Sequence, residues 1–478
     1  MTYSRRKEVV REYADNIANQ RDSWIEKNIY YYQCDYSYMR FLVPGGLSVL
    51  EVGCGTGRLL AELNPSAGVG VDLSVNMITV ARHAHPNLTF IQGDAEDTEF
   101  MNSIGRTFDV IILSDTIGSL SDCQLALNNL HPLCTPETRI IIAYYSKAWE
   151  PLLKAAARAG FKMPQPELNW LSTDDIINLL RLSDFEPIKR EWRQLVPRQL
   201  WGLGPVINSY IAPMPGIRRL CLRNYVVARV SPHIQRHPRP TSVSIVIPCK
   251  NERGNIENAI LRLPSFCENT EILFVEGGST DGTGEEIQRV INKYSERNIR
   301  LLPQDGKGKA NAVRKGFDAA TGEVLMILDA DLTMPPEDLP KYFEALASGR
   351  GEFINGSRLI YPMDDDAMRF LNYIANWIFS WLFTWLLNQR FTDTLCGTKV
   401  LRKHDYEMIH QNRSYFGEFD PFGDFDLIFG AVKLNKKVQE IPVRYAGRAY
   451  GETQISRFRH GWLLLKMVVF AFRKMKAI

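Results

Sequence analysis

Two aspartates, spaced two residues apart, follow an apolar run in the second half of the chain. The segment VLMILDADLT places Asp329 and Asp331 after that run and Thr333 two positions later. Because alternate residues of an extended strand point to the same side, the two carboxylates could share one divalent cation, Mg2+ or Mn2+. Such a hard cation also binds the phosphates of a nucleotide. For an isolated pair of this kind, the simpler alternative is a solvated acidic turn before Pro335 and Pro336.

Shorter motifs in the same half carry polar side chains at predicted strand ends. The segment VSIVIPCKNERGNI opens with a β-branched run that we expect Pro248 to stop, and the strand in EILFVEGGSTDGT is predicted to end at Glu276. Strand ends of an α/β sheet gather at one edge, where ligands bind. The lysines of DGKGKANAVRKGF could offset phosphate charge, although a solvated loop is an equally good interpretation. The candidates for binding a sugar nucleotide are Pro248, Glu252, Glu276, Asp281, Lys307 and Lys309.

Taken together, these motifs resemble the family 2 glycosyltransferases of the GT-A fold, and among them the dolichol- and polyprenyl-phosphate mannosyltransferases. The resemblance extends over residues 241–478 and is carried by IPCKNERGNI, VEGGSTDGT, GKGKANAVRKGF, LDADLTMPPEDL, INGSRL, DTLCGTKVLRK and EIPVRYAGRAYGET. It implies inverting transfer of a sugar from GDP-mannose or a UDP-hexose to a polyprenyl phosphate, with the metal at Asp329 and Asp331. It also implies that Arg358 lies at the donor phosphates and that Arg369 and Arg448 bind the acceptor phosphate.

One motif departs from that family. Where the family usually shows VDDGSxDGT, this chain has Glu276, Gly277 and Gly278, which leaves the donor nucleotide open. A degenerate domain that only binds or acts as a scaffold is the corresponding alternative. A phosphate acceptor is already anionic and needs no strong base, whereas a glycan hydroxyl would need one. The candidate bases for that second alternative are Asp393, Asp424 and Asp426.

The first half has its own glycines and acids at predicted strand ends. The run SVLEV ends near Glu51, and Gly53, Gly55 and Gly57 follow before a helical pattern. Glycines here let the backbone approach a ligand and let the helix pack close to the strand. The alternatives are a plain strand-to-helix turn for the glycines, a helix N-cap for Asp94 and a loop acid for Asp115. The acids that end the next three strands are Asp72, Asp94, with Ala95 beside it, and Asp115.

The order VLEVGCGTG, GVDLSVNM, FIQGDAED and FDVIILSDTIGSL resembles the class I S-adenosylmethionine-dependent methyltransferases over about residues 30–230. The spacing GxGxG, rather than GxGxxG, favours the methyl donor over a dinucleotide. The resemblance implies that the glycine loop passes the methionine part of the cofactor, that Asp72 holds the ribose and that Asp94 lies beside the adenine amine. The methyl acceptor is expected to be a small molecule, with a sugar or lipid-linked intermediate of the same pathway as the candidate.

Both halves alternate strands with helical patterns, so we predict α/β folds with two doubly wound domains. The Rossmann-like methyltransferase domain is expected at 1–230, a linker at 231–242 and the GT-A domain at 243–478. The net charge is +3, which gives no reason to expect a nucleic-acid partner, and the eight cysteines form no CxxC pair. The N-terminal residues contain no apolar run, so no signal peptide is expected. The sequence indicates no oligomeric state.

Two segments suggest peripheral attachment to the cytoplasmic face of a membrane. The uncharged run at 370–388 carries one polar stripe and one tryptophan stripe at helical spacing, which suits a helix in the membrane interface. The alternative is a buried amphipathic helix under the active site. The segment 458–478 has a short apolar run with basic flanks, which favour anionic headgroups.

Overall fold

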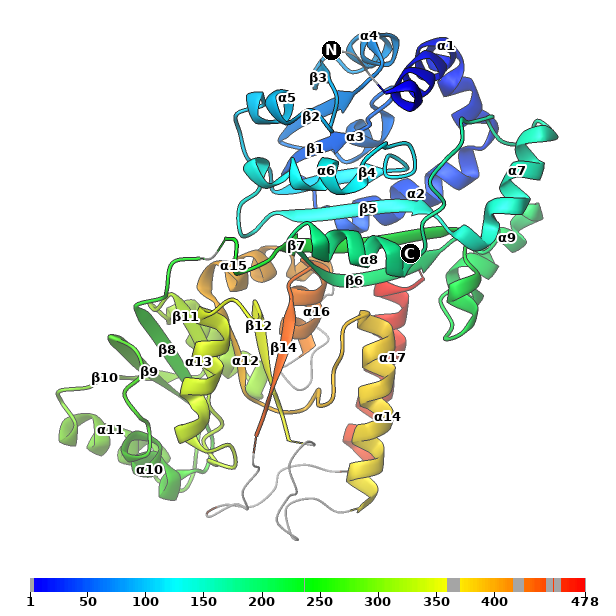
Figure 1. Ribbon diagram of the computed structural model, residues 1–478. Helices are drawn as coiled ribbons and strands as arrows, with labels where there is room; N and C mark the ends of the chain where they lie inside the picture. Colours follow the sequence, from blue (N-terminus) through cyan, green and yellow to red (C-terminus); the bar gives the residue numbers. More distant parts are fainter. Residues whose placement is uncertain are drawn as a thin grey trace. The chain divides into compact units, whose positions relative to one another are not determined.

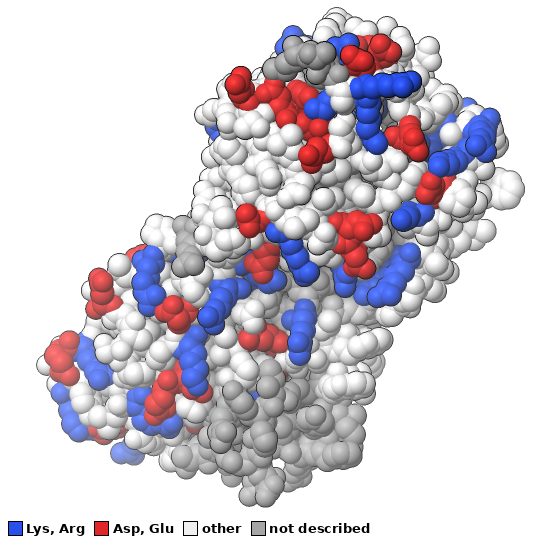
Figure 2. All heavy atoms as spheres, in the orientation of Figure 1, with Lys and Arg blue, Asp and Glu red and all other residues white. Residues whose placement is uncertain are grey.

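The computed structural model describes residues 4–235, 237–358, 370–415, 425–443, 450 and 457–477 (Figure 1). The chain forms two compact units. The first ends at Gln235 and also contains Lys476, and the second follows Gln235 and ends at Met475. Lysine and arginine side chains are interspersed with acidic ones over the visible face of both units (Figure 2).

The first unit is built on a seven-stranded sheet in the order β3-β2-β1-β4-β5-β7-β6. The strands β1 to β5 are parallel to one another, and β7 is antiparallel to both β5 and β6. The sheet strands are β1 (Ser48–Val52), β2 (Ala67–Asp72), β3 (Thr89–Gln92), β4 (Val110–Ser114), β5 (Arg139–Tyr145), β6 (Phe185–Arg193) and β7 (Arg223–Val230).

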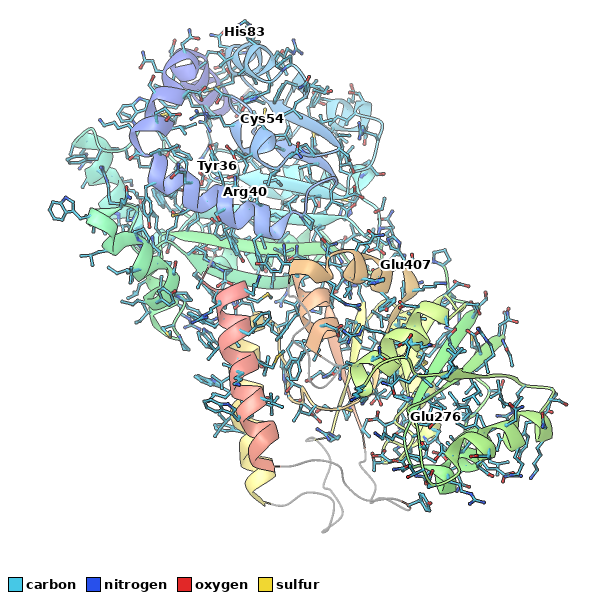
Figure 3. All side chains as sticks on the ribbon, turned by 180° about the vertical axis from the view of Figure 1, so that it is seen from behind. Tyr36, Arg40, Cys54, His83, Glu276 and Glu407 are labelled. Atoms are coloured by element: carbon cyan, nitrogen blue, oxygen red, sulfur yellow. The ribbon has the colours of Figure 1, made fainter. Side chains whose placement is uncertain are left out.

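Helices cover both faces of this sheet, with α2 on the face seen in Figure 3 and α6 and α8 on the face seen in Figure 1. The apolar runs of β1, β4 and β5 are almost fully buried between them. The helices are α1 (Arg5–Lys27), α2 (Ile29–Leu42), α3 (Arg58–Glu62), α4 (Val75–Ala84), α5 (Thr98–Ser103), α6 (Cys123–Asn128), α7 (Glu150–Arg158), α8 (Thr173–Leu182) and α9 (Leu203–Val206).

The second unit contains another mixed seven-stranded sheet, in the order β10-β9-β8-β11-β13-β12-β14. The strands β10, β9, β8 and β11 are mutually parallel, and β13 is antiparallel to both β11 and β12. The strands are β8 (Ser242–Cys249), β9 (Asn269–Glu276), β10 (Asn298–Pro303), β11 (Val324–Ile327), β12 (Phe353–Ser357), β13 (Lys399–Arg402) and β14 (Val438–Pro442).

The helices of this unit include two long ones, α14 and α17, that pack against each other. They run side by side in both Figure 1 and Figure 3. The helices are α10 (Ile256–Leu261), α11 (Thr283–Lys293), α12 (Lys309–Ala319), α13 (Leu339–Ala347), α14 (Phe370–Leu387), α15 (Lys403–Gln411), α16 (Phe425–Lys433) and α17 (Arg457–Met475).

The predicted fold class, two α/β domains, is therefore confirmed, and both sheets are mixed. Two local expectations are wrong. Pro248 does not stop its strand, because it pairs with Val275 and β8 continues to Cys249. Strand β11 ends at Ile327, so Asp329 and Asp331 lie on the following turn rather than on alternate positions of a strand.

Across the part of the chain that the structure describes, every helix is too short or too polar to span a bilayer. The predicted polar stripe of α14 faces inward where its side chains are described. Ser380 and Thr384 both donate hydrogen bonds to the carbonyl of Phe391, at 2.6 and 3.0 Å. The tryptophan stripe lies on another side of the helix, where Trp377 and Trp381 are exposed.

Candidate active sites

The glycine turn after β1 forms one wall of a cavity of about 210 Å3 in the first unit. Gly53 has φ +74°, and a Cβ there would lie 2.3 Å from Thr116 Oγ1. Gly55 has φ +52°, and a Cβ there would lie 2.7 Å from Arg21 Nε. The turn therefore needs glycine both for its left-handed backbone and for the close approach of its neighbours. Gly57, also at positive φ, is the N-cap residue of α3 and does not line the cavity.

The acids predicted at the strand ends converge on this cavity. Asp72, at the end of β2, accepts hydrogen bonds from the backbone N–H groups of Gly55 (2.8 Å) and Ser74 (2.9 Å). Burial raises its pKa, and these hydrogen bonds oppose that rise. Asp72 is thus fixed beside the glycine turn, where its oxygens can accept hydrogen bonds from ribose hydroxyls, and the turn and the carboxylate together fit S-adenosylmethionine.

Two further acids of the cavity have unusual environments. Glu51 accepts a hydrogen bond from the N–H of Leu60, at 3.1 Å, and burial raises its pKa to about 8. Asp115 has φ +61°, an uncommon backbone conformation for a residue other than glycine. Its carboxylate is paired with Arg223, whose Nε also donates to Asp35 at 2.9 Å. Burial raises the pKa of Asp115, against the effect of Arg223.

Asp94 and Ala95 line the cavity at the end of β3. Asp94 is not a helix cap, because Asp97 caps α5. Lys7 of α1 binds Asp94 at 2.8 Å and Glu96 at 3.1 Å. A cofactor whose adenine amine donates to Asp94 would have to share that carboxylate with Lys7 or replace it.

The helix α1 covers the cavity with one face, and sequence analysis did not identify it. Its lining positions recur every three or four residues, which is the spacing of one helical face. Asp22 accepts a hydrogen bond from Thr56 Oγ1 of the glycine turn, at 2.8 Å, and Asp15 accepts one from the N–H of Asn76, at 3.2 Å. The lining residues of α1 are Lys7, Val10, Tyr13, Ala14, Ile17, Arg21 and Ile25.

Arg21 is the cation of α1 nearest to the glycine turn. The carboxylates of Glu51, Asp72 and Asp115 are close enough to raise its pKa, although its burial acts in the opposite direction. Among the described residues, no hydrogen bond or ion pair joins its guanidinium to any of them. Lys7 and Arg58, the other bases that line the cavity, are both paired with acids. Arg21 is thus a cavity cation that is available to an anionic ligand.

Part of the cavity lining is aromatic. Tyr32 and Tyr36 of α2 and Tyr145 of β5 line it, next to Asp115. In Figure 3, Tyr36 lies on α2 and Cys54 lies in the glycine turn. Tyr144, the neighbour of Tyr145 in β5, does not line the cavity.

In the second unit, Asp329 lies in a crowded group of charges after β11. Lys309, the first residue of α12, binds Asp329 at 2.6 Å. Burial favours the neutral acid, but Lys309, Lys399 and Arg358 outweigh it and lower the pKa of Asp329. A Cβ on Gly397 would lie 1.9 Å from Asp329 Oδ2 and 2.4 Å from Lys309 Nζ. Only glycine fits at position 397 without moving this pair.

Asp331 turns its Oδ1 toward Thr333, which donates from both its N–H (3.1 Å) and its hydroxyl (2.8 Å). No group of three or more His, Cys, Asp or Glu side chains that could hold a metal ion exists among the described residues. Two carboxylates and a hydroxyl are nonetheless hard oxygen donors, and Mg2+ is commonly held by one or two carboxylates together with substrate phosphates and water. The residues present thus fit a metal that arrives with a nucleotide.

Arg358 and Asp393 form a tight buried pair. The guanidinium donates from Nε to Asp393 Oδ2 (2.6 Å) and from its second nitrogen to Oδ1 (2.9 Å), and the backbone N–H of Arg358 donates as well (3.1 Å). The exposed fraction of the Asp393 side chain is 1%. Burial alone would raise the pKa of Asp393, but Arg358 holds it below its usual value. This carboxylate is poorly suited to take a proton.

The predicted nucleotide loop is closed by its own side chains. Glu276, labelled in Figure 3, accepts hydrogen bonds from the N–H groups of Ser279 (2.6 Å) and Gly278 (3.1 Å). These bonds lower its pKa in spite of burial. The longer acid therefore organises the turn that follows β9. Asp281 accepts from the N–H groups of Thr283 (3.0 Å) and Arg253 (3.2 Å) and so links this turn to the one after β8.

The remaining nucleotide candidates are placed as follows. Glu252 is buried, donates its N–H to Thr283 Oγ1 (3.0 Å) and accepts from the side chain of Asn255 (2.7 Å). Pro248 is partly buried within β8, whereas Lys307 is exposed. The structure thus brings the turns after β8 and β9 together through Glu252 and Asp281.

Three predicted residues, Arg369, Arg448 and Asp424, lie outside the described residues. Asp426 is described and lies 3.7 Å from Arg314 and 3.5 Å from Arg413. Sequence analysis missed Lys399, which is fully buried and close enough to Asp329 to lower its pKa. A lysine within an apolar strand of the DTLCGTKVLRK run was the available signal.

Two family models match the chain, one in each half. The family model described as "Methyltransferase domain" matches residues 45–195, and "Glycosyl transferase family 2" matches residues 244–406. A dolichol-phosphate mannosyltransferase of Pyrococcus furiosus is 30% identical over 236 residues, which are 47% of this chain and 64% of that protein. An undecaprenyl-phosphate 4-deoxy-4-formamido-L-arabinose transferase of Aeromonas hydrophila is 32% identical over 218 residues, 44% of this chain and 62% of that protein.

The chain thus spans less than two thirds of the length of these curated relatives. Among solved structures, a methyltransferase of Thermotoga maritima is 17% identical, with 46% of this chain and 99% of that chain covered and a TM-score of 0.36.

Proposed function

We propose that this chain, a fusion of a methyltransferase domain with a glycosyl transferase family 2 domain, transfers both a sugar and a methyl group. The second domain would move a sugar from GDP-mannose or a UDP-hexose to a polyprenyl phosphate, with inversion at the anomeric carbon. The first would move the methyl group of S-adenosylmethionine to a small acceptor. The two relatives described above are named for sugar transfer to dolichol phosphate and undecaprenyl phosphate, which supports the acceptor.

The main observation in favour of a phosphate acceptor is the pairing of Arg358 with Asp393. A hydroxyl acceptor needs a carboxylate that can accept its proton. Asp393 is buried and held ionised by a two-pronged guanidinium, and Asp426 lies near two arginines. A phosphate acceptor has already lost its proton and needs cations instead. Of the two candidate bases that the structure describes, neither is well placed to take a proton, and this supports the phosphate over the glycan hydroxyl.

Asp329 and Asp331, with Thr333 close by, would hold Mg2+ or Mn2+, which neutralises charge on the leaving nucleoside diphosphate. Lys309 stands at the first turn of α12, where the helix dipole also favours anions. With the metal present, Asp329 has a second cation to balance, so Lys309 could turn toward the diphosphate. Glu276 and Asp281 stabilise the conformation of the turn after β9, which would border the nucleotide. Lys307 is exposed and would reach the phosphates only from the rim.

The test offers purified protein several labelled sugar nucleotides together with polyprenyl phosphate and Mg2+ or Mn2+. We expect lipid-extractable label from one donor. The label should disappear in Asp331→Ala but persist in Glu344→Ala, which removes an exposed acid that binds Arg239. If no donor gives lipid-extractable label, a polyprenyl phosphate acceptor would be refuted in favour of a glycan hydroxyl.

For methyl transfer, the supporting observation is the cavity between the glycine turn and α1. Asp72 would accept hydrogen bonds from the ribose, and Asp94 and Ala95 would border the adenine. We infer that Arg21 pairs with the methionine carboxylate, because Lys7 and Arg58 already bind acids. Tyr145 and Asp115 would then border the acceptor. When bound, the cofactor supplies an electrophilic methyl group, and the chain's main task is to align the acceptor with it.

Calorimetry tests cofactor binding directly. We expect S-adenosylmethionine to bind the intact chain and Asp72→Ala to weaken that binding strongly. Asp174→Ala changes an exposed acid of α8 and serves as the matched control. If the cofactor does not bind the unaltered chain, the first domain is a structural module.

We also propose peripheral attachment of the second unit to the cytoplasmic face of a membrane. The packed pair α14 and α17 exposes Trp377 and Trp381 on one helix and Trp462, Leu465 and Val469 on the other. Tryptophan at the rim of an apolar face suits the membrane interface. Deletion of residues 457–478 should lower binding to anionic vesicles, and unchanged binding would contradict this assignment.

A further inference from the structure

A long excursion joins two neighbouring strands of the first unit. The strands β6 and β7 are antiparallel, and their last paired residues are Arg193 and Arg223. Two to five residues suffice to connect such a pair. Here residues 194–222 lie between them, so most of this segment is not needed to close the hairpin. A connection of this length in a compact domain usually has a function of its own.

The exposed side chains of residues 194–222 are predominantly apolar. Trp201 is fully exposed, and the backbone of Trp201 and its neighbour Leu200 has positive φ, at 52° and 43°. That left-handed conformation is uncommon for large side chains, so these two residues form a specific turn. Soluble surfaces rarely expose so many large apolar groups together unless they bind something. The exposed large apolar residues are Leu200, Trp201, Leu203, Val206, Tyr210, Ile211, Met214 and Leu220.

The charges of this segment are all positive. Residues 194–222 read QLVPRQLWGLGPVINSYIAPMPGIRRLCL, with three arginines and no lysine, aspartate or glutamate. Arg198 lies 5.4 Å from the centre of the Phe161 ring, and both residues are exposed. Arg218 lies 5.0 Å from the centre of the Trp192 ring. Apolar side chains edged by arginines match an anionic lipid surface, where each cation gains from the negative potential.

The excursion is attached to the walls of the cofactor cavity. Asn208 donates to Tyr30 Oη of α2 (3.0 Å), and Gln194 donates to the backbone carbonyl of Tyr31 (2.9 Å). The same helix carries Tyr32 and Tyr36, which belong to the aromatic part of the cavity lining. A bilayer bound to this segment would therefore lie close to the part of the cavity that we assign to the methyl acceptor.

We propose that residues 194–222 insert their apolar side chains into the headgroup region of an anionic bilayer, and that the first domain methylates an acceptor held at that bilayer. The membrane contact stands independently of the methyl transfer. The class of acceptor, an amphiphile such as a lipid-linked sugar, rests on the proposed function. This contact is separate from the one that we assign to α14 and α17, because it belongs to the other unit.

Hydrogen exchange of the full chain gives a local test. Vesicles of phosphatidylcholine with phosphatidylglycerol should slow amide exchange within 196–220, and vesicles of phosphatidylcholine alone should slow it less. The variant Trp201→Ser/Leu203→Ser should lose this protection and bind vesicles about 100-fold more weakly, since two large side chains no longer enter the lipid. The control Val75→Ser/Leu182→Ser removes two exposed apolar side chains elsewhere in the first unit and should behave like the unaltered chain.

Two results would overturn the membrane contact. One is exchange within 196–220 that vesicles leave unchanged. The other is protection that appears without vesicles and grows with protein concentration, which would identify a second copy of the chain as the partner. The acceptor class is tested with S-adenosylmethionine carrying a labelled methyl group and vesicles of total cell lipid. We expect organic-extractable label that falls in the Trp201→Ser/Leu203→Ser variant while cofactor affinity is unchanged. Label confined to the aqueous phase would refute the acceptor class, and absence of cofactor binding would refute methyl transfer itself.

Discussion

Arg21 allows the cofactor assignment to be tested at a single charge. In Arg21→Gln, the cavity keeps its glycine turn and its acids but loses the cation that stands between Glu51, Asp72 and Asp115. A hydrogen bond to a charged group contributes about 1.5–3 kcal/mol net. We therefore expect a carboxylate-bearing cofactor to bind about 10- to 100-fold more weakly.

Ligands that lack the carboxylate should respond differently. Decarboxylated S-adenosylmethionine carries only positive charge on its methionine part, so removal of Arg21 leaves uncompensated acids that attract it. Its affinity should stay the same or rise. Methylthioadenosine, which lacks the amino-acid part altogether, should bind both proteins alike. The comparison thus separates loss of one ion pair from general damage to the cavity.

Isothermal titration calorimetry with S-adenosylhomocysteine, decarboxylated S-adenosylmethionine and methylthioadenosine measures these differences. Arg21→Lys should recover part of the affinity for S-adenosylhomocysteine, and Arg5→Gln, which alters an exposed arginine of the same helix, is the control. Equal affinity of the Arg21→Gln and unaltered proteins for S-adenosylhomocysteine would refute the pairing. So would an equal loss of affinity for all three ligands.

Three further perturbations test other parts of the structure. Gly397→Ala should reduce sugar transfer about 100-fold, because the new Cβ displaces Asp329 and Lys309 and a shift of about 1 Å has such an effect; Gly45→Ala, with open space around it, is the control, and labelled transfer in both is the measurement. Asp393→Asn should lower sugar transfer at every pH rather than remove the acidic limb of the pH profile, because Asp393 fixes Arg358 and takes no proton; loss of the acidic limb would point to a base. Glu51, whose pKa of about 8 lies above the usual 4.5, holds a proton in the folded state that the unfolded chain releases. Its contribution to the free energy of unfolding is complete below about pH 4.5 and is lost as the pH rises to about 8, by about 1.4 kcal/mol per pH unit. In Glu51→Gln, the unfolding temperature of the first unit should therefore depend less on pH in this range.

Sequence reasoning could predict the glycine turn and the strand-end acids that line the first cavity. Asp72, Asp94 and Asp115 follow parallel strands, and parallel strands in a doubly wound sheet end at one edge, so their convergence follows from topology. The contribution of α1 could not be predicted in the same way. A stripe of apolar residues along a helix shows that one face is buried, but it does not show which part of the protein covers that face. Arg21 lies within such a stripe of α1, and the stripe faces the cavity that the acids line.

In the second unit, the motifs located the charged residues but not their pairings. Asp393 was a reasonable candidate base on position alone, and only its two-pronged contact with Arg358 shows why proton transfer suits it poorly. Glu276 was predicted to bind the nucleotide, and the sequence did not indicate that its carboxylate also closes the turn that follows it. Pairings of this kind depend on distances between segments far apart in the chain, which spacing along the sequence does not determine.

Two apolar, cationic surfaces on one chain have a consequence for how both reactions find their acceptors. The exposed side chains of each surface would enter only the headgroup region, so each surface would bind a bilayer reversibly by itself. When one surface is bound, the other is held near the same bilayer at a high effective concentration, and the combined affinity can exceed either by several orders of magnitude. Loss of either surface should then weaken vesicle binding by a similar large factor, and loss of both should release the chain. The alternative is that each loss lowers the fraction of vesicle-bound protein only by the share that its own surface contributes. The two surfaces would then bind different bilayers, or only one of them would bind at a time. Joint engagement would give the fusion a physical purpose: a lipid that receives a sugar from one domain would remain in the bilayer on which the other domain acts.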